Sequence, residues 1–175
     1  MDPLLPYLAG FFDGEGSIGI YTNRNPHRGR TLRVQITQNV SNESTRLLQE
    51  CRRRWGGSLS VMNRSYKRDA WNWQTSSASG VRFLREVRPW LKLKAAQADI
   101  ALGFWDERGF RRRGPGGRFL PLSAEVRALG DEAEAALRAA KRGDAAHESR
   151  AVPATRLVLP APQAALWPLV NVKGD

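Results

Sequence analysis

The stretch Tyr7-Leu-Ala-Gly-Phe-Phe-Asp-Gly-Glu-Gly-Ser-Ile18 decides the fold of this 175-residue chain. It predicts a short apolar helix that ends in an acidic, glycine-rich turn and leads into a strand beginning at Ser17. Apolar side chains from Leu4 to Phe12 cover most of the helix circumference, so we expect burial on nearly all sides. Gly10 costs about 1 kcal/mol relative to alanine inside a helix, which favours a packing role where another backbone approaches closely.

Two acids, Asp13 and Glu15, stand at the end of this predicted helix. A carboxylate at the end of a buried element needs a partner, and a divalent metal ion is one such partner. Either acid could instead stabilise the turn. The buried setting favours a metal role for Glu15, whereas a structural role and a functional role are equally supported for Asp13.

Residues 8–16, Leu-Ala-Gly-Phe-Phe-Asp-Gly-Glu-Gly, resemble the signature motif of the LAGLIDADG homing endonucleases. Two more segments resemble the single-motif, intron-encoded branch of that family. Val34-Gln-Ile-Thr-Gln38 is similar to a strand whose last glutamine positions active-site water. Pro89-Trp-Leu-Lys-Leu-Lys94 is similar to a segment whose last lysine lies in the active site. One position departs from the pattern, because Asn42 stands where the branch carries a basic residue, and Arg46 is a candidate substitute.

This resemblance implies a catalytic set of Glu15, Gln38 and Lys94. It implies that the Glu15 carboxylate and the Gly14 carbonyl hold divalent ions, with Mg²⁺ expected and Mn²⁺ or Ca²⁺ able to occupy the site. Lys94 would offset transition-state charge and Gln38 would orient water. Because the chain carries one copy of the motif, the resemblance also implies a homodimer with the motif helices packed on the two-fold axis. The implied dimer contacts are Leu8, Ala9, Gly10, Phe12 and Asp13.

The rest of the chain predicts a repeated unit of one helix and two strands. The expected elements after the motif helix are strands 17–22 and 30–38, helix 42–55, strands 59–64 and 70–75, and helices 79–88, 93–106 and 123–142. The fold class is therefore α+β, an αββαββα fold with one four-stranded antiparallel sheet and additional C-terminal helices. We expect the endonuclease domain to occupy residues 1–142 and an irregular C-terminal extension to occupy residues 143–175.

The positive charge is concentrated in the segment that follows the motif. The whole chain carries a net charge of +11, and residues 16–94, with 16 basic and four acidic residues, carry +12 of positive charge, against −3 for residues 1–15 and +2 for residues 95–175. Such a distribution indicates a polyanion-binding surface. A twisted antiparallel sheet can enter the major groove and read base edges with alternating side chains. The expected DNA contacts are Arg24, Arg28, Arg30, Arg33, Gln35, Thr37, Asn63, Arg64, Lys67, Arg68, Asn72 and Gln74.

The sequence thus predicts a homodimeric, site-specific DNA endonuclease that makes a metal-dependent double-strand break with 3′ overhangs in a long pseudo-palindromic target. Two alternatives on the same fold remain: an RNA maturase with intron RNA as its partner, and a cleavage-dead DNA-binding regulator. No stretch predicts a membrane span or a signal peptide, so we expect an intracellular protein of a bacterial cytoplasm or an organelle matrix. The single cysteine, Cys51, excludes an internal disulfide.

Overall fold

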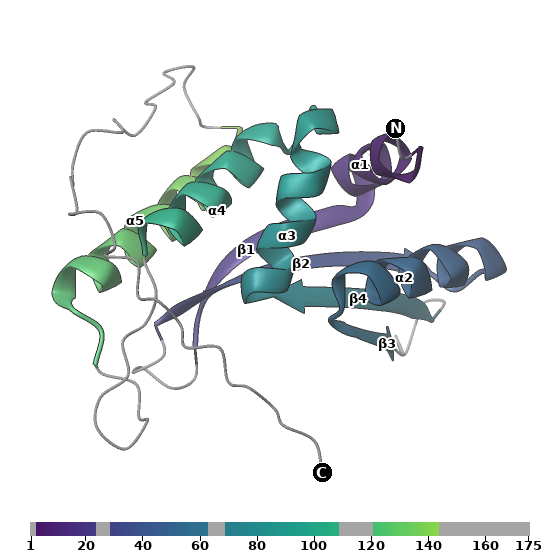
Figure 1. Ribbon diagram of the computed structural model, residues 1–175, viewed down its shortest axis with the longest axis horizontal. Helices are drawn as coiled ribbons and strands as arrows, with labels where there is room; N and C mark the ends of the chain where they lie inside the picture. The colour runs from purple at the N-terminus through teal and green to yellow at the C-terminus, as the bar shows by residue number, and fades with distance from the viewer. Residues whose placement is uncertain (1–2, 24–28, 63–68, 109–120, 144–175) are drawn as a thin grey trace, which may run out of the picture. The chain divides into compact units, whose positions relative to one another are not determined.

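The computed structural model describes residues 3–23, 29–62, 69–108 and 121–143. The elements are α1 (Leu4–Glu15), β1 (Gly16–Thr22), β2 (Arg30–Asn39), α2 (Asn42–Trp55), β3 (Ser58–Met62), β4 (Ala70–Ser76), α3 (Ser77–Val87), α4 (Ala95–Glu107) and α5 (Ala124–Arg142), with a short 3-10 helix, Arg88–Trp90, before α4 (Figure 1). This order confirms the predicted αββαββα fold class with additional helices. The predicted extension beyond Gly143 lies outside the described residues.

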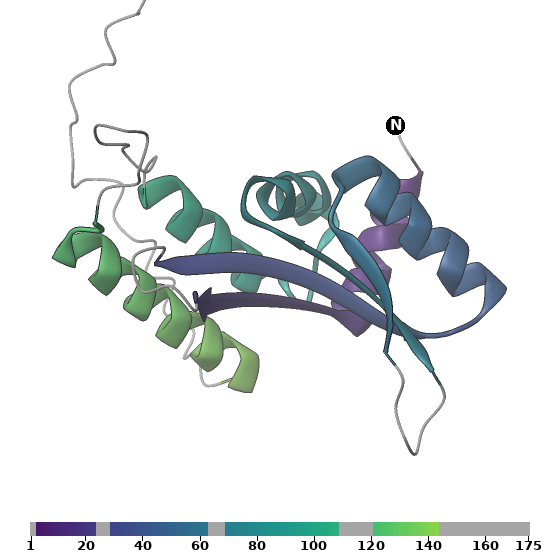
Figure 2. The same ribbon diagram turned by 90° about the horizontal axis from the view of Figure 1, so that it is seen from below.

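The four strands form one antiparallel sheet in the order β1-β2-β4-β3. Each hairpin supplies two neighbouring strands, and the hairpins join where β2 pairs with β4. The register places Gly16 of β1 opposite Ile36 of β2, and Ile36 in turn opposite Trp73 of β4. Figures 1 and 2 show the helices gathered along one side of this sheet. The described part of the chain contains no helix long and apolar enough to cross a membrane.

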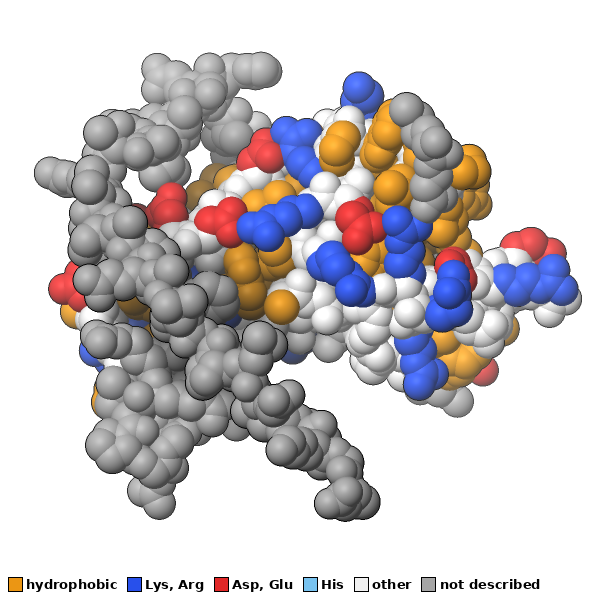
Figure 3. Space-filling view, viewed as in Figure 1, with side chains coloured by type: hydrophobic (Ala, Val, Ile, Leu, Met, Phe, Trp, Pro, Cys, Tyr) orange, Lys and Arg blue, Asp and Glu red, His pale blue; other side chains and the backbone are white. Residues whose placement is uncertain are grey.

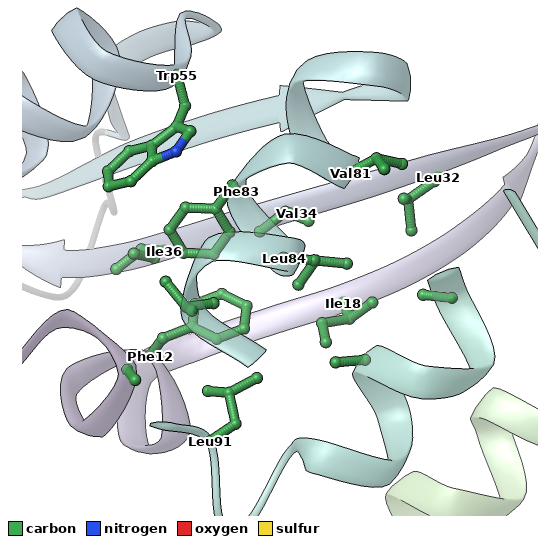
Figure 4. Packing of buried hydrophobic residues seen from close by; sticks show 14 of the residues in the cluster. Phe12, Ile18, Leu32, Val34, Ile36, Trp55, Val81, Phe83, Leu84 and Leu91 are labelled. Atoms are coloured by element: carbon green, nitrogen blue, oxygen red, sulfur yellow. The ribbon is translucent and has the colours of Figure 1, made fainter. Parts of the chain in front are cut away.

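Alternation along β2 decides which side of the sheet the helices cover. Leu32, Val34 and Ile36 are completely buried, whereas the residues between them are only half-buried. On the covered side, the ring of Phe83 from α3 lies 5.1 Å, centroid to centroid, from the rings of both Phe12 and Trp55 (Figure 4). Rings at this separation in edge-to-face geometry contribute beyond their buried area. The core therefore joins α1, α2 and α3 to one face of the sheet.

Local sequence signals fix the ends of α2. The Ser41 side chain accepts a hydrogen bond from the Ser44 backbone N–H, and the Ser44 side chain accepts one from the Ser41 backbone N–H, which forms a capping box. The helix ends before Gly56, as the glycine pair predicts. A Cβ atom at Gly57 would lie 2.3 Å from the Gln74 carbonyl oxygen, and its φ is +91°, so only glycine lets β3 begin here.

The C-terminal helices extend the same core. α4 buries Ala98, Ala101 and Phe104 and so turns its small residues toward its neighbours. α5 packs against α4 and β1 and buries Ala133 and Leu137 in the same hydrophobic cluster.

Candidate functional site

The carboxylate of Asp13 is held inside the chain by backbone amides. It lies on the last turn of α1 and is 8% exposed. Its Oδ2 atom accepts hydrogen bonds from the N–H groups of Lys92 at 2.7 Å and Leu93 at 3.1 Å, and its Oδ1 atom accepts one from Lys94 at 2.8 Å. Burial raises the pKa of Asp13, but these hydrogen bonds and the Lys94 charge outweigh it and leave the pKa below its usual value. Asp13 therefore joins the motif helix to the start of α4.

Lys94 completes this junction from the other direction. Its Nζ atom donates a hydrogen bond to the backbone carbonyl of Asp13 at the C-terminal end of α1. A cation is favourable there because the last carbonyls of a helix lack intrahelical partners and carry the negative end of the helix dipole. The ammonium group of Lys94 is thus held in the turn of helix that carries Gly14 and Glu15.

Glu15 has the opposite environment to Asp13. It is the last residue of α1, its side chain is exposed, and no described residue forms an ion pair or hydrogen bond with its carboxylate. Gly14 is exposed beside it, and a Cβ atom built there would meet nothing within 4 Å. The end of α1 therefore presents to its surroundings a carboxylate that has no described partner, next to the exposed Gly14.

Gln38 lies at the same end of the sheet. Glu15 directly precedes Gly16, which pairs with Ile36, so Gln38 is two strand residues, or about 7 Å, beyond that pair. Its Oε1 atom accepts a hydrogen bond from the Asn39 N–H at 2.9 Å. Its side chain lines a hollow between α1 and α2, together with Tyr7, Phe11, Asn39, Ser41, Glu43, Ser44 and Leu47. The structure thus holds Lys94 beside Glu15 at the end of α1, and it places Gln38 further along β2, in the hollow between α1 and α2.

The exposed face of α1 differs from the predicted dimer face. Leu8, Ala9 and Phe12 are completely buried within the chain. The Asp13 carboxylate is buried as well and accepts hydrogen bonds from three backbone amides. These residues cannot contact a second copy directly, because the chain's own core already covers them. The face left uncovered is formed by Tyr7, which is 62% exposed, and by Gly10 and Gly14. Of the predicted contacts only Gly10 lies on that face, and the motif helix is not buried on all sides.

The uncovered face of the sheet is lined by neutral polar side chains and one arginine. Ser17, Gln35, Gln74 and Ser58 form a row across all four strands in register. Thr37, Asn72 and Ser60 form the next row, in which the Thr37 hydroxyl donates to the Asn72 side-chain oxygen at 3.1 Å. Arg33 extends from the same face of β2. Strand alternation thus places five predicted DNA contacts together: Arg33, Gln35, Thr37, Asn72 and Gln74.

Arg30, in contrast, does not lie on this face. It shares the parity of Leu32, and its Nε atom donates to Asp131 of α5 at 2.8 Å. A second guanidinium nitrogen forms an ion pair with Glu134, and a third bond goes to the Thr22 hydroxyl. We therefore correct the prediction that Arg30 contacts DNA, because its guanidinium group forms ion pairs with two carboxylates that fix α5 to the sheet.

The remaining predicted contacts, Arg24, Arg28, Asn63, Arg64, Lys67 and Arg68, lie outside the described residues. Arg46 and Asn42 are both exposed on the first turns of α2, and the substitution of one for the other stays a prediction. On the helix-covered side, many charges are paired, as in Arg85 with Asp106 and Arg88 with Asp99. Figure 3 shows such basic and acidic side chains lying beside each other over the helices.

Sequence reasoning missed two features of the site. The three backbone partners of Asp13 lie about 80 residues away, and no local pattern indicates them. Tyr21, which lies on the open face of β1, could have been found from parity, because it is two residues from Gly19 and four from Ser17 and therefore shares their face.

Comparisons with known proteins agree with the fold. The family model described as LAGLIDADG endonuclease matches residues 8–87. No curated protein matches the sequence. The homing endonuclease I-CvuI in complex with its target aligns over 79% of this chain and 80% of that chain, with 18% identity and a TM-score of 0.54. The LAGLIDADG homing endonuclease I-GzeII in complex with its DNA target aligns over 79% of this chain and 44% of that chain, with 19% identity and a TM-score of 0.52. The match over residues 8–87 and the shared fold confirm the resemblance, and they assign the described part of the chain to the LAGLIDADG endonuclease fold.

Proposed function

We propose that this chain is a homing endonuclease that cleaves both strands of a long, pseudo-palindromic DNA site as a homodimer. The observation that carries the proposal is the exposed Glu15 carboxylate, which has no partner among the described residues and lies at the edge of an open, polar sheet face. The likeness to endonucleases bound to DNA supports the same substrate. The open face would contact the duplex, and the end of α1 would meet the scissile phosphates.

The donor set at the end of α1 fits a divalent metal ion. Mg²⁺ prefers oxygen ligands and is usually held by one or two carboxylates together with substrate phosphates. The Glu15 carboxylate and the Gly14 carbonyl supply such oxygens. Within the described ranges, no group of three His, Cys, Asp or Glu residues could hold a metal on its own. A second copy and the DNA would therefore supply the remaining ligands. When bound, the ion supplies charge stabilisation for the attacking and leaving oxygens.

The other residues of the site act on the substrate and on water. Lys94, whose ammonium group is bonded to the end of α1, would offset the charge that develops on the phosphate. Gln38 would orient the attacking water. Asp13 would act indirectly, because its three hydrogen bonds hold the backbone that carries Lys94 in place. We further propose that the two cuts leave 3′ overhangs.

The single motif in the given sequence and the uncovered face of α1 support a homodimer. Gly10 and Gly14 are one helical turn apart, and a Cβ atom at either position would meet no described residue within 4 Å. Two glycines on one helix face let a second helix approach closely. Packing this face on its symmetry mate would bring two Glu15 carboxylates together and give each sheet one half-site.

The proposal is tested by incubating the full chain with a library of random duplex DNA and Mg²⁺ and sequencing the cleaved ends. We expect ends that share one long site with two-fold symmetry and 3′ overhangs of constant length, and no cleavage in EDTA. Enrichment of bound duplexes without any cleavage would contradict the enzyme and favour the DNA-binding regulator. Absence of both binding and cleavage, with binding of intron RNA instead, would favour the maturase.

A further inference from the structure

Gly19 and Tyr21 form an unusual surface on the open face of β1. A Cβ atom built at Gly19 would lie 2.3 Å from Cε2 of Tyr21 and 2.6 Å from its hydroxyl oxygen. The Tyr21 ring therefore lies over Gly19, in the space that any larger side chain would fill. Tyr21 is 39% exposed, so the outer face of its ring remains accessible.

Arg33 reaches this surface from the neighbouring strand. It is the register partner of Gly19 across the β1–β2 pair. Its guanidinium carbon lies 4.8 Å from the centroid of the Tyr21 ring, within the range of a cation–π interaction. The missing side chain at Gly19 is what lets the Arg33 side chain and the Tyr21 ring meet.

The guanidinium of Arg33 has no acidic partner in the described part of the chain. Its Nε atom is buried and makes no hydrogen bond there. On the same strand, Arg30 is held by Asp131 and Glu134. The plane of Arg33 is thus oriented by stacking on an aromatic ring, whereas Arg30 is oriented by carboxylates.

We propose that Arg33, oriented by Tyr21, reads a guanine in the DNA target, so that the two residues together determine specificity at one base pair of each half-site. The inference rests on the proposed function, because it takes the open face as the DNA-binding face. A planar guanidinium matches the O6 and N7 acceptors of guanine in the major groove, and stacking fixes the plane before DNA arrives. Two-fold symmetry then requires the guanine at the same distance from the centre in both halves.

Positive charge alone is insufficient for reading a guanine. A lysine at position 33 would keep the positive charge and the attraction to phosphates, but it lacks the planar pair of donors. We therefore expect the Arg33→Lys variant to lose its preference for guanine while it keeps most of its overall affinity for DNA. This separation distinguishes base reading from a role in which Arg33 merely covers the hairpin.

The test is selection of bound duplexes from a random DNA library by the full chain, followed by sequencing, for the wild type and four variants. We expect the wild type to recover a symmetric site with one conserved guanine per half. Arg33→Lys and Tyr21→Leu should both lower the guanine preference at that same pair by about tenfold or more, while the other positions keep theirs. Tyr21→Phe keeps the ring and should keep the preference. Arg52→Lys, on the exposed side of α2, is the matched arginine control and should change nothing.

The outcomes separate the two proposals. If the wild type enriches no symmetric site, the proposed function fails and this inference fails with it. If the wild type enriches a site whose base preferences are unchanged in Arg33→Lys, only the inference is overturned. It is also overturned if Arg33→Lys and Tyr21→Leu relax different base pairs. A thermal melt of each variant checks folding, and Arg33→Lys alone decides the result if Tyr21→Leu does not fold.

Discussion

Arginine side chains have opposite environments on the two faces of the sheet. On the covered face, Arg30 is held by two carboxylates of α5 and is only 19% exposed at its side chain. On the open face, three residues further along β2, Arg33 forms no ion pair with a carboxylate of the described residues and stacks on Tyr21. The first arginine fixes a helix to the sheet, and the second makes no ion pair with the described residues.

The two acids of the motif repeat this contrast at the end of α1. Asp13 is buried and accepts three backbone hydrogen bonds, whereas Glu15 is exposed and has no described partner. Residues whose polar groups are satisfied internally hold the fold together. Residues whose polar groups are left unsatisfied at the surface of a well-packed core are available for substrate and metal.

The largest effect is expected from Glu15→Gln. We expect DNA cleavage to slow by about 10³-fold, as when a group that stabilises transition-state charge is lost. DNA binding and the melting temperature should change little, because Glu15 has no described partner to lose. Single-turnover cleavage of the recovered site measures this, with Glu132→Gln, an exposed acid on α5, as the control. Cleavage at the wild-type rate would remove Glu15 from the active site.

Gly10→Leu should break the dimer without harming the chain. A Cβ atom built at Gly10 meets no described residue within 4 Å, and leucine favours a helix more than glycine does, so the folded monomer is expected to be at least as stable. The dimer should weaken by about 100-fold or more, because overpacking a tight contact costs about 1–3 kcal/mol in each copy. Sedimentation equilibrium measures this, and Gly103→Leu on α4, also in open space, is the matched control. Equal dimerisation of both variants would contradict a dimer through α1.

Asp13→Asn should destabilise the fold by about 1–3 kcal/mol, because an amide cannot replace three charge-assisted hydrogen bonds. The folded-state pKa of Asp13 is held below the ordinary value of 3.8, so its stabilisation is complete above that pH and is lost as the pH falls through the folded-state pKa. The difference between wild type and variant should therefore shrink on acidification. Urea unfolding at about pH 7 and about pH 3 measures it. A constant difference would show that the charge is not what stabilises the junction.

Arg30→Met should have the smallest effect of the four, about 1–2 kcal/mol of stability, because one of its two acidic partners, Asp131, is largely exposed. The base preferences of the selected DNA should not change. Arg33→Met in parallel should change base preference and leave stability nearly constant. If the two variants exchanged these phenotypes, the assignment of the two sheet faces would be reversed.

Much of the fold could be predicted because its signals are local. The predicted strand 30–38 and the predicted helices 42–55 and 79–88 are confirmed to within two residues at each end by β2, α2 and α3. The glycine pair after α2 and the proline after α3 mark helix ends in the sequence itself. The repeated unit predicted one four-stranded antiparallel sheet, and the structure adds the strand order, in which β2 pairs with β4 and Gln35 lies opposite Gln74.

The features that could not be predicted depend on residues far apart in the chain. Arg30 shares the parity of the buried residues on β2, but its acidic partners come about 100 residues later. The partners of Asp13 are similarly distant. The uncovered face of α1 could not be separated from its buried face by composition, because both contain small and aromatic residues.

Modification of arginine side chains with a dicarbonyl reagent, in the free chain and in its complex with the selected duplex, tests most directly whether the open face binds DNA. Mass spectrometry reports the extent of reaction at each arginine. We expect DNA to protect Arg33, to leave Arg52 on α2 fully reactive, and to leave Arg30 slow in both states. Protection of Arg52 with unchanged reaction at Arg33 would place the DNA on the helices and contradict the open face as the binding surface.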